Sequence, residues 1–346
     1  MYGKYVLKRA GYGILMYVIM IFVYSTLFNS VADRTMSSLI DEQVAQEMTR
    51  YKSLDEAQRA GLREERIQAK RRQYHLDEPL ASRIFWRGVD TITFNFRNST
   101  IIKASDGDRR VLKIVGEALP RTIVLFTTEA ALVTVVGVMM GLGLARKPNG
   151  PLDRFNSGIT MITNGLPAWW LGMLMIMVFS YALPVFPSGG IRSNPPPEGL
   201  MGVLDYLWHL ALPLVTLTLL GLWSTAYITR NIVLSNLQED YIMAARARGV
   251  PERLVLFSHT LRSSMPAIMT LAILGLFGSI AGNIIVEGIF GWPGIGNLYF
   301  VAVQQNDVPV LMATLAIETL INMGGFVLLD IVYGLLDPRI KTGGRA

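Results

Sequence analysis

The sequence contains no cysteine and only three histidines among its 346 residues. The lack of cysteine excludes disulfides, thiolate nucleophiles and cysteine-based metal sites. The histidines, at positions 75, 209 and 259, are too far apart in the sequence to form a metal-ligand spacing. No segment has the Gly-rich pattern ending in Lys and Ser or Thr that cradles nucleotide phosphates, and no nucleophile stands in a pattern with a base. We therefore expect no catalytic residue, no metal site and no cofactor site in this chain.

Charge is also missing from long stretches of the chain. Charged residues make up 17% of the sequence and apolar residues 51%. The charges avoid six apolar segments, each of which has the roughly 20 residues that a membrane-spanning helix needs. We predict spanning helices over residues 10–32, 122–145, 156–184, 206–229, 263–286 and 308–329. Pro167 and Pro184 are expected to bend or end the third of these helices. The sequence therefore predicts an all-α membrane protein with six transmembrane helices.

The distribution of lysine and arginine in the short loops predicts the orientation. The loops at 146–154 and 236–265 and both ends of the chain are rich in these residues. The loop at 185–205 has only Arg192, and the loop at 287–307 has none. Because basic residues are enriched in cytoplasmic loops, both termini are expected in the cytoplasm and the chain in the cell membrane.

About half of the charged residues lie in one segment between the first two spans. We divide the chain into an N-terminal tail with the first span (1–32), a soluble extracytoplasmic insertion (33–119) and a core with spans two to six (120–341). Within the insertion, residues 53–73 are predicted to form a helix that Ser53 and Glu56 begin as a capping box. Acidic and basic residues alternate along it, which favours a solvated helix over a nucleic-acid-binding arm.

The loop at 236–265 has the clearest local pattern. Residues 240–248 are predicted to form a short helix with Asp240 at its start and Arg246 near its end, an arrangement that suits the helix dipole. Gly249 suits a left-handed cap, and Pro251 prevents continuation of the helix. The alanines between them leave a smooth face that a partner protein can approach. An amphipathic helix lying on the lipid headgroups is the alternative interpretation.

The same loop resembles the cytoplasmic "EAA" loop of binding-protein-dependent ABC importer permeases, in the version found in the dipeptide/oligopeptide/nickel permease family. The matching residues are Tyr241, Ile242, Ala245, Arg246, Ala247, Gly249, His259, Leu261, Arg262 and Pro266. Met243 stands at the glutamate position of the motif, so Glu239 or Asp240 would have to supply a carboxylate.

Further motifs of the family occur in this chain, in the same order along the sequence. They include Tyr74, Leu76, Asp77 and Pro79 in the insertion, Glu287, Phe290, Trp292, Pro293, Gly294 and Gly296 after span five, and Asp337, Pro338 and Arg339 near the C-terminus. One departure concerns residues 94–99, which stand where the family has Gly-Asp-Leu-Gly-x-Ser. Phe94 and Arg97 occupy the positions of its two glycines.

The resemblance implies the type I ABC importer fold and one half of a translocation pathway for di- or oligopeptides. Oligosaccharides and nickel complexes are alternative cargoes. The implied partners are a sister permease, two cytoplasmic ATPase subunits that hold ATP and Mg, an extracytoplasmic substrate-binding protein and membrane lipid, with no nucleic acid. The residues implied to couple to an ATPase are Asp240, Tyr241, Ala244, Ala245, Arg246, Arg248 and Gly249. A gradient-driven secondary transporter is the alternative class, which would predict internal repeats or ionisable relays.

Polar residues inside spans are costly and therefore candidates for function. Those in or at the ends of the predicted spans are Glu129, Asn164, Asn283, Glu318 and Asn322, which we assign to pore or interspan contacts. For the asparagines we favour helix–helix hydrogen bonds. Gly137 and Gly141 predict close helix packing. Trp292, Pro293 and Gly294 predict a rigid external turn, a gate or a docking point for the binding protein, with Trp292 as an interfacial anchor.

Overall fold

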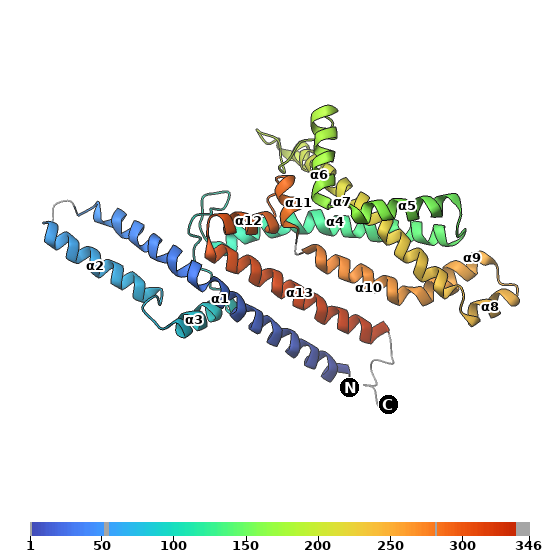
Figure 1. The fold of residues 1–346 in the computed structure, drawn as a ribbon, viewed down its shortest axis with the longest axis horizontal. Coiled ribbons are helices and arrows are strands. Elements are labelled where there is room, and N and C mark those ends of the chain that lie inside the picture. Colours follow the sequence, from blue (N-terminus) through green and yellow to red (C-terminus); the bar gives the residue numbers. More distant parts are fainter. Residues whose placement is uncertain (1, 52–54, 281, 337–346) are drawn as a thin grey trace. The chain divides into compact units, whose positions relative to one another are not determined.

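The computed structural model describes residues 2–51, 55–280 and 282–336. Within these ranges the chain is helical, apart from turns and one isolated antiparallel bridge between Asn98 and Arg110 (Figure 1). The helices are α1 (Tyr2–Met48), α2 (Glu56–Gln73), α3 (Leu80–Ile92), α4 (Val111–Ala145), α5 (Pro151–Gly165), α6 (Ala168–Ile176), α7 (Gly199–Asn236), α8 (Asp240–Ala247), α9 (Glu252–Leu254), α10 (Leu261–Ile280), α11 (Ile284–Ile289), α12 (Ile295–Gln304) and α13 (Val308–Leu336), with π-helical segments η1 (Met177–Ala182) and η2 (Val255–Thr260).

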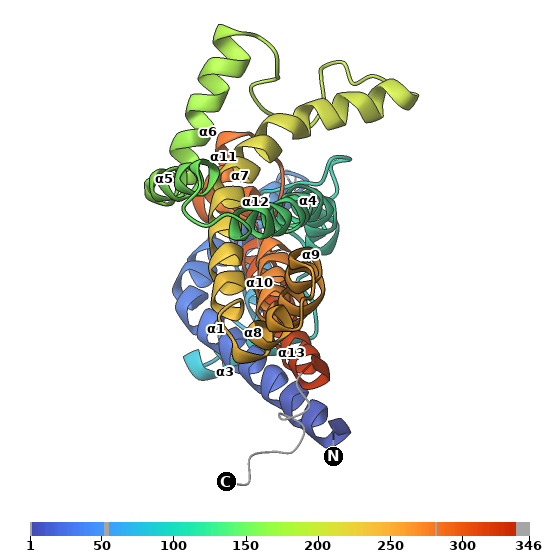
Figure 2. The same ribbon diagram turned by 90° about the vertical axis from the view of Figure 1, so that its right-hand side faces the viewer.

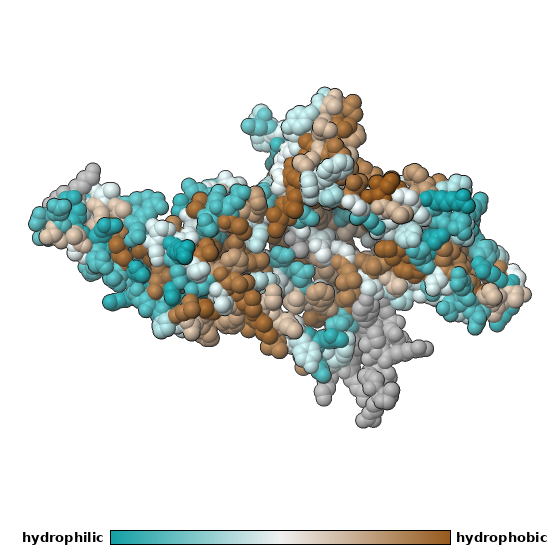
Figure 3. All heavy atoms as spheres, in the orientation of Figure 1, coloured by the Kyte–Doolittle hydropathy of each residue, from teal (hydrophilic) through white to brown (hydrophobic). Residues whose placement is uncertain are grey.

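Five helical stretches of the described residues are long and apolar enough to cross a membrane, and a bent pair of helices makes a sixth. The prediction of an all-α protein with six spans is therefore confirmed. The helices extend beyond several predicted spans: α1 continues to Met48, and α4 begins at Val111. In Figure 3 hydrophobic side chains lie along the long helices, whereas hydrophilic ones cover the region of α2 and that of α8.

The third predicted span is not one continuous helix. α5 ends at Gly165, α6 begins at Ala168, and the two axes differ by 97°. Pro167 is the N-cap of α6. The ring of a proline disfavours the helical conformation in the residue before it, and Leu166 accordingly has an extended ψ of 123°. Figure 2 shows α6 turning away from α5. The predicted bend at Pro167 is therefore confirmed, and the third predicted span is a bent pair of helices.

Two other predicted boundaries differ from the structure. The fifth span ends at Ile280 rather than 286, because Gly282 has φ +73° and Asn283 starts a new short helix. The helix of the insertion begins at Glu56, and Asp55 is its N-cap, with a side chain that accepts from the Glu56 amide. The predicted cap at Ser53 lies outside the described residues.

The chain divides into two compact units, and the first contains residues 1–9, 119–297 and 324–346. Within it α7 packs against α5, α6 and α10. α4 approaches α7 closely, because a Cβ atom on Gly141 would lie 2.6 Å from the carbonyl oxygen of Ala226. A Cβ atom on Gly137 would lie 2.8 Å from Cγ2 of Thr225. The predicted close packing at both glycines is confirmed.

A buried ion pair joins α5 to α7 in the same unit. The guanidinium of Arg230 donates to both carboxylate oxygens of Asp153, at 2.9 Å and 2.6 Å. The Asp153 side chain is only 3% exposed. Asp153 also accepts from the amide of Asn149 at 2.8 Å, which closes the turn before α5. A bidentate pair of this kind fixes orientation as well as distance.

The second unit comprises residues 10–118 and 298–323. Its α1 and α2 form a helical hairpin, in which Ile40 and Val44 pack with Leu62 and Ile67. Between α3 and α4 the chain runs through a loop at 93–110. Phe94 and Arg97 in this loop both have φ +58°, the left-handed conformation that glycine adopts freely. These are the positions of the two lost glycines, and each non-glycine residue there costs on the order of 1–2 kcal/mol.

One carboxylate connects the loop to the start of α13. Asp307 is fully buried and accepts from the Ser99 hydroxyl at 2.5 Å. It also accepts from the amides of Ile101 and Ile102 at 2.9 and 3.0 Å. A buried carboxylate needs several such donors, and the loop supplies them. The path of the loop is therefore determined by a residue far away in the sequence.

Candidate functional site

The loop between α7 and α10 contains the short helix predicted from the sequence. α8 spans Asp240–Ala247, with Asp240 in its first turn and Arg246 in its last. Gly249 has φ +79°, and its amide donates to the carbonyl oxygen of Arg246 at 2.9 Å. Pro251 then ends the turn and begins α9. The sequence thus determines both ends of α8, and the prediction of this helix and its left-handed cap is confirmed.

One face of α8 is anchored and the opposite face is free among the described residues. Ile242 is fully buried, and α8 packs against η2. Tyr241 and Met243 are 49% and 58% exposed, and Ala244 is exposed between them. A helix held on one side and exposing small and large side chains on the other can transmit a push from a bound partner to the spans that follow.

An ion pair stiffens the C-terminal end of α8. Arg246 donates to both carboxylate oxygens of Glu252, at 3.1 Å and 2.6 Å. Both side chains are well exposed, so the pair contributes at most about 1 kcal/mol. Its main effect is geometric, because it links α8 to α9 across the Gly249 turn. Because Glu252 already pairs with Arg246, the C-cap residue Arg248 is the arginine with more freedom to meet a partner.

A hydrogen bond closes the base of this loop. The Asn236 side chain at the end of α7 donates to the hydroxyl of Ser264 in α10 at 2.7 Å. Ser264 in turn donates to the carbonyl oxygen of Thr260 in η2 at 2.8 Å. Movement of α8 and η2 would therefore reach both α7 and α10. Asn236 and Ser264 were not among the predicted site residues, and no local pattern marks them.

Glu129 lines a cavity within the first unit. The cavity has a volume of about 220 Å³ and lies among α4, α7 and α10. Thr134, Thr225 and Thr229 line it as well, and its other lining residues are mainly apolar. The prediction that Glu129 lies in a pore or between spans stays a prediction, and the cavity gives it a specific place.

The other predicted polar residues have different environments. Asn164 is exposed next to the bend between α5 and α6. Asn283 lies outside the fifth span and caps α11, accepting from the amides of Ile285 and Val286 at 3.1 and 3.0 Å. Asn322 donates to the carbonyl oxygen of Glu318 in its own helix at 3.0 Å. The preference for helix–helix hydrogen bonds was therefore wrong for Asn283 and Asn322, because each side chain is hydrogen-bonded to backbone atoms of its own helix.

The turn at 292–294 is closely packed, and its tryptophan is not at the surface. Trp292 is fully buried in an apolar cluster, and its indole nitrogen donates to the carbonyl oxygen of Arg121 at 3.0 Å. Its interpretation as an interfacial anchor was therefore wrong, because the chain's own core surrounds the ring. Gly294 is required by the packing, since a Cβ atom there would lie 2.3 Å from the Thr122 hydroxyl oxygen. The role of Trp292, Pro293 and Gly294 as a gate or docking point stays a prediction.

Glu287 organises the same turn, and its role was missed in the sequence. Its carboxyl group is fully buried and accepts from the Thr122 hydroxyl at 2.7 Å and the Asn297 amide at 2.8 Å. Burial raises the pKa of the Glu287 carboxyl above its ordinary value, and these two hydrogen bonds oppose the rise. Thr122 accepts in turn from the amide of Ile295 at 2.7 Å. Three separate segments thus meet at one carboxyl group.

Comparisons with known proteins show which family the chain resembles. Residues 134–342 match the family described as "Binding-protein-dependent transport system inner membrane component". The chain is 31% identical to the oligopeptide transport system permease protein AppB of Bacillus subtilis, over 78% of this chain and 83% of the relative. It is 29% identical to the dipeptide transport system permease protein DppB of Lactococcus lactis, over 78% of this chain and 83% of the relative. A solved structure of an amino acid ABC transporter with histidines matches with a TM-score of 0.39 and 17% identity, over 62% of this chain and 92% of that one.

Proposed function

The chain belongs to the family of binding-protein-dependent transport system inner membrane components, and from this premise we propose that it is one half of the translocation pathway of a peptide importer driven by ATP. The observation that carries the proposal is α8, which the chain holds by Ile242 on one side and exposes on the other. Peptides are the proposed cargo because relatives of this chain are named as oligopeptide and dipeptide permeases. Oligosaccharides and nickel complexes are the alternative cargoes.

The proposed assembly has four further subunits: one sister permease, two cytoplasmic ATPases that bind ATP and Mg, and an extracytoplasmic substrate-binding protein that delivers the cargo. In the proposed orientation both termini and α8 are cytoplasmic, as the distribution of lysine and arginine predicts. Closure of the ATPases on ATP would press on α8. Because Asn236 and Ser264 join the two ends of the loop, that movement would reach α7 and α10 together.

The first test is a pull-down of the tagged chain from its native membrane in mild detergent, followed by mass spectrometry. We expect a homologous permease and ATPase subunits with nucleotide-binding motifs in the complex. Recovery of the chain alone, or as a homodimer without an ATPase, would contradict the proposal and favour a gradient-driven transporter.

A pair of variants then tests α8 itself. Ala244→Trp adds a bulky side chain to the exposed face, whereas Ala244→Ser changes its size little. We expect the tryptophan variant to insert normally and to lose the ATPases in the pull-down, while the serine variant retains them. Equal recovery of ATPases with both variants would show that this face is not the docking surface.

The cargo needs a separate measurement. We expect a strain that lacks this chain to lose uptake of labelled di- and oligopeptides, and to regain it when the chain is restored. Unchanged peptide uptake, together with loss of oligosaccharide or nickel uptake, would replace the cargo and leave the importer class intact.

A further inference from the structure

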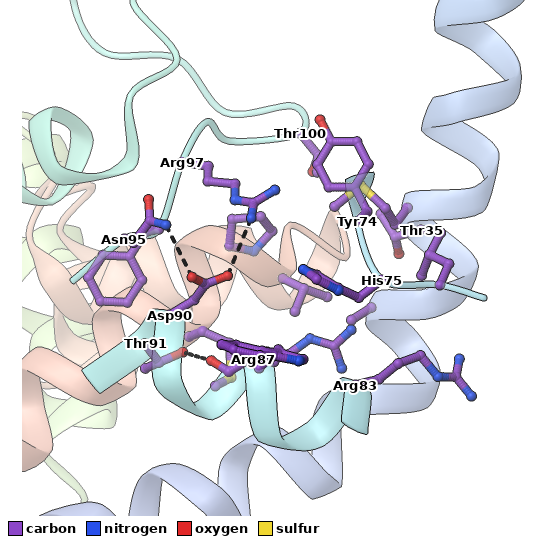
Figure 4. A pocket seen from close by; sticks show the side chains of 18 residues that line it. Thr35, Tyr74, His75, Arg83, Arg87, Asp90, Thr91, Asn95, Arg97 and Thr100 are labelled. Carbon is purple, nitrogen blue, oxygen red and sulfur yellow. Dashed lines mark hydrogen bonds and ion pairs between the residues drawn. The ribbon is translucent and has the colours of Figure 1, made fainter. Parts of the chain in front are cut away.

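A small cavity lies within the second unit, among α1, α3, the 93–110 loop and the start of α13 (Figure 4). Its volume is about 120 Å³. An engineered apolar cavity of about 150 Å³ binds benzene, so this smaller cavity has room for at most one small ring or a short branched chain. Its apolar lining includes Met36, Leu76, Trp86, Phe96 and Met312.

Three arginines also line the cavity, and two of them share one carboxylate. Arg83 and Arg87 both pair with Asp33, at 2.5 Å and 3.1 Å. Arg97 has one ion pair, with Asp90 at 3.5 Å. This distance is longer than the roughly 2.7–2.9 Å of a strong charge-assisted hydrogen bond. A third carboxylate, that of the fully buried Asp307, accepts from the backbone amide of Thr100 at 3.3 Å, so the charges around the cavity balance. Of the three arginines, Arg97 has the longest ion pair and is the one most easily drawn to a ligand.

Two buried polar atoms in the lining have no partner among the described residues. The hydroxyl of Thr100 is buried without a hydrogen bond, in a residue only 8% exposed. The Nε atom of Arg83 is buried in the same way. More than nine in ten buried polar groups normally have a partner, so the Thr100 hydroxyl can still donate to an acceptor that enters the cavity.

The surroundings of Arg97 show where that acceptor would lie. Its guanidinium stands over the ring of Tyr74, with 5.4 Å from its central carbon to the ring centroid. Asp90 also accepts from the Asn95 side chain at 3.1 Å, so its charge is shared. In Figure 4 Arg97 and Thr100, which come from the 93–110 loop, both lie above Arg87 and Thr91 of α3.

We propose that this cavity is a binding site for an apolar group that carries a carboxylate. The ring or branched chain packs against Trp86 and Met36, and the carboxylate accepts from Arg97 and Thr100. A planar guanidinium matches a carboxylate with two parallel hydrogen bonds. The C-terminal residue of a peptide and a free aryl carboxylic acid share this chemistry. Binding at this site needs neither ATP nor a partner subunit, so it goes beyond the proposed transport function.

The backbone provides a matched pair of variants. Arg97 and Phe94 both have φ +58°, so glycine at either position fits the native backbone. Arg97→Gly removes a cation from the lining of the cavity. Phe94→Gly also introduces a glycine into the loop backbone, but Phe94 does not line the cavity. A difference between the two variants would therefore report on the side chain of Arg97 and not on the loop backbone.

The experiment is calorimetric titration of the purified full chain in lipid nanodiscs. The probes are 3-phenylpropionate, the tripeptide Ala-Ala-Phe with a free C-terminus, and the same tripeptide with a C-terminal amide. We expect saturable binding of at least one of the two carboxylates, and equal affinity in the wild type and Phe94→Gly. Arg97→Gly is expected to bind about tenfold more weakly or worse, as is the amide, because each loses a hydrogen bond to a charged group.

The pattern across the probes identifies the source of the ligand. Binding of the tripeptide carboxylate indicates the C-terminal residue of a peptide, whereas binding of 3-phenylpropionate alone indicates a free acid. Absence of saturable binding, equal binding of the amide, or wild-type affinity in Arg97→Gly would each overturn the proposal. None of these outcomes depends on the recovery of ATPases, so the proposed transport function is tested independently.

Discussion

Replacing Gly294 with alanine tests the packing of the turn at 292–294. The added Cβ would lie 2.3 Å from the Thr122 hydroxyl oxygen and 2.5 Å from Oε1 of Glu287. Both neighbours are buried and hydrogen-bonded to each other, so neither can move aside alone. Overpacking of a core costs about 1–3 kcal/mol. Loss of the Thr122 hydrogen bond to a buried carboxyl adds about 1–3 kcal/mol.

The expected destabilisation is therefore about 2–6 kcal/mol. For a chain of this size that corresponds to a fall in unfolding temperature of roughly 3–8 °C. The assay is heating of the detergent-purified chain followed by size-exclusion chromatography of the fraction that remains folded, because membrane proteins often unfold irreversibly.

Gly288→Ala is the matched control. Gly288 lies in α11, six residues before Gly294, and a Cβ atom there would meet nothing within 4 Å. Alanine in a helix interior is more favourable than glycine by about 0.5–1 kcal/mol, so this variant should match or exceed the wild type. If Gly294→Ala unfolds at the wild-type temperature, the argument that Thr122 and Glu287 leave no room at this position is wrong.

Three further predictions concern other parts of the chain. Gly141→Val should reduce the folded yield after heating, because α4 touches α7 there, whereas Gly143→Val, with open space around it, should not. Asp307→Ala should release the 99–102 loop and make it the first site of proteolysis; unchanged cleavage would contradict its anchoring role. Arg110 lowers the pKa of Asp108 from 3.8 to about 2. The stabilisation from this pair is present above the ordinary pKa and is lost only as the pH falls through about 2, so NMR of the loop should show the pair intact at pH 4 and broken below 2.

The features predictable from the sequence are those that neighbouring residues determine. The spans follow from long charge-free runs, and α8 follows from Asp240, Gly249 and Pro251, which lie within twelve residues of one another. The bend at Pro167 could be predicted for the same reason. Its angle of 97° could not, because it depends on how α5 and α6 pack against α7.

The features that escaped prediction depend on contacts between distant segments. Glu287 meets Thr122 across 165 positions, and Asp307 meets Ser99 across 208. A glutamate in an apolar stretch suggests a pore or an interface, and nothing local indicates a partner within the same chain. Trp292 was misplaced for the same reason: tryptophans often lie at membrane interfaces, but this one packs in a cluster that includes Leu125 and Leu212.

The anchoring of the 93–110 loop has a consequence for engineering. The insertion looks like a cassette that could be exchanged between relatives by splicing the chain once before it and once after it. The loop within it, however, is held by Asp307, which lies almost two hundred residues after the end of the insertion. A chimera that receives the insertion without its own version of this carboxylate would carry a loop whose amides have lost their acceptor. Exchange of the insertion therefore has to be a two-part transplant, with the segment around residue 307 moved together with it.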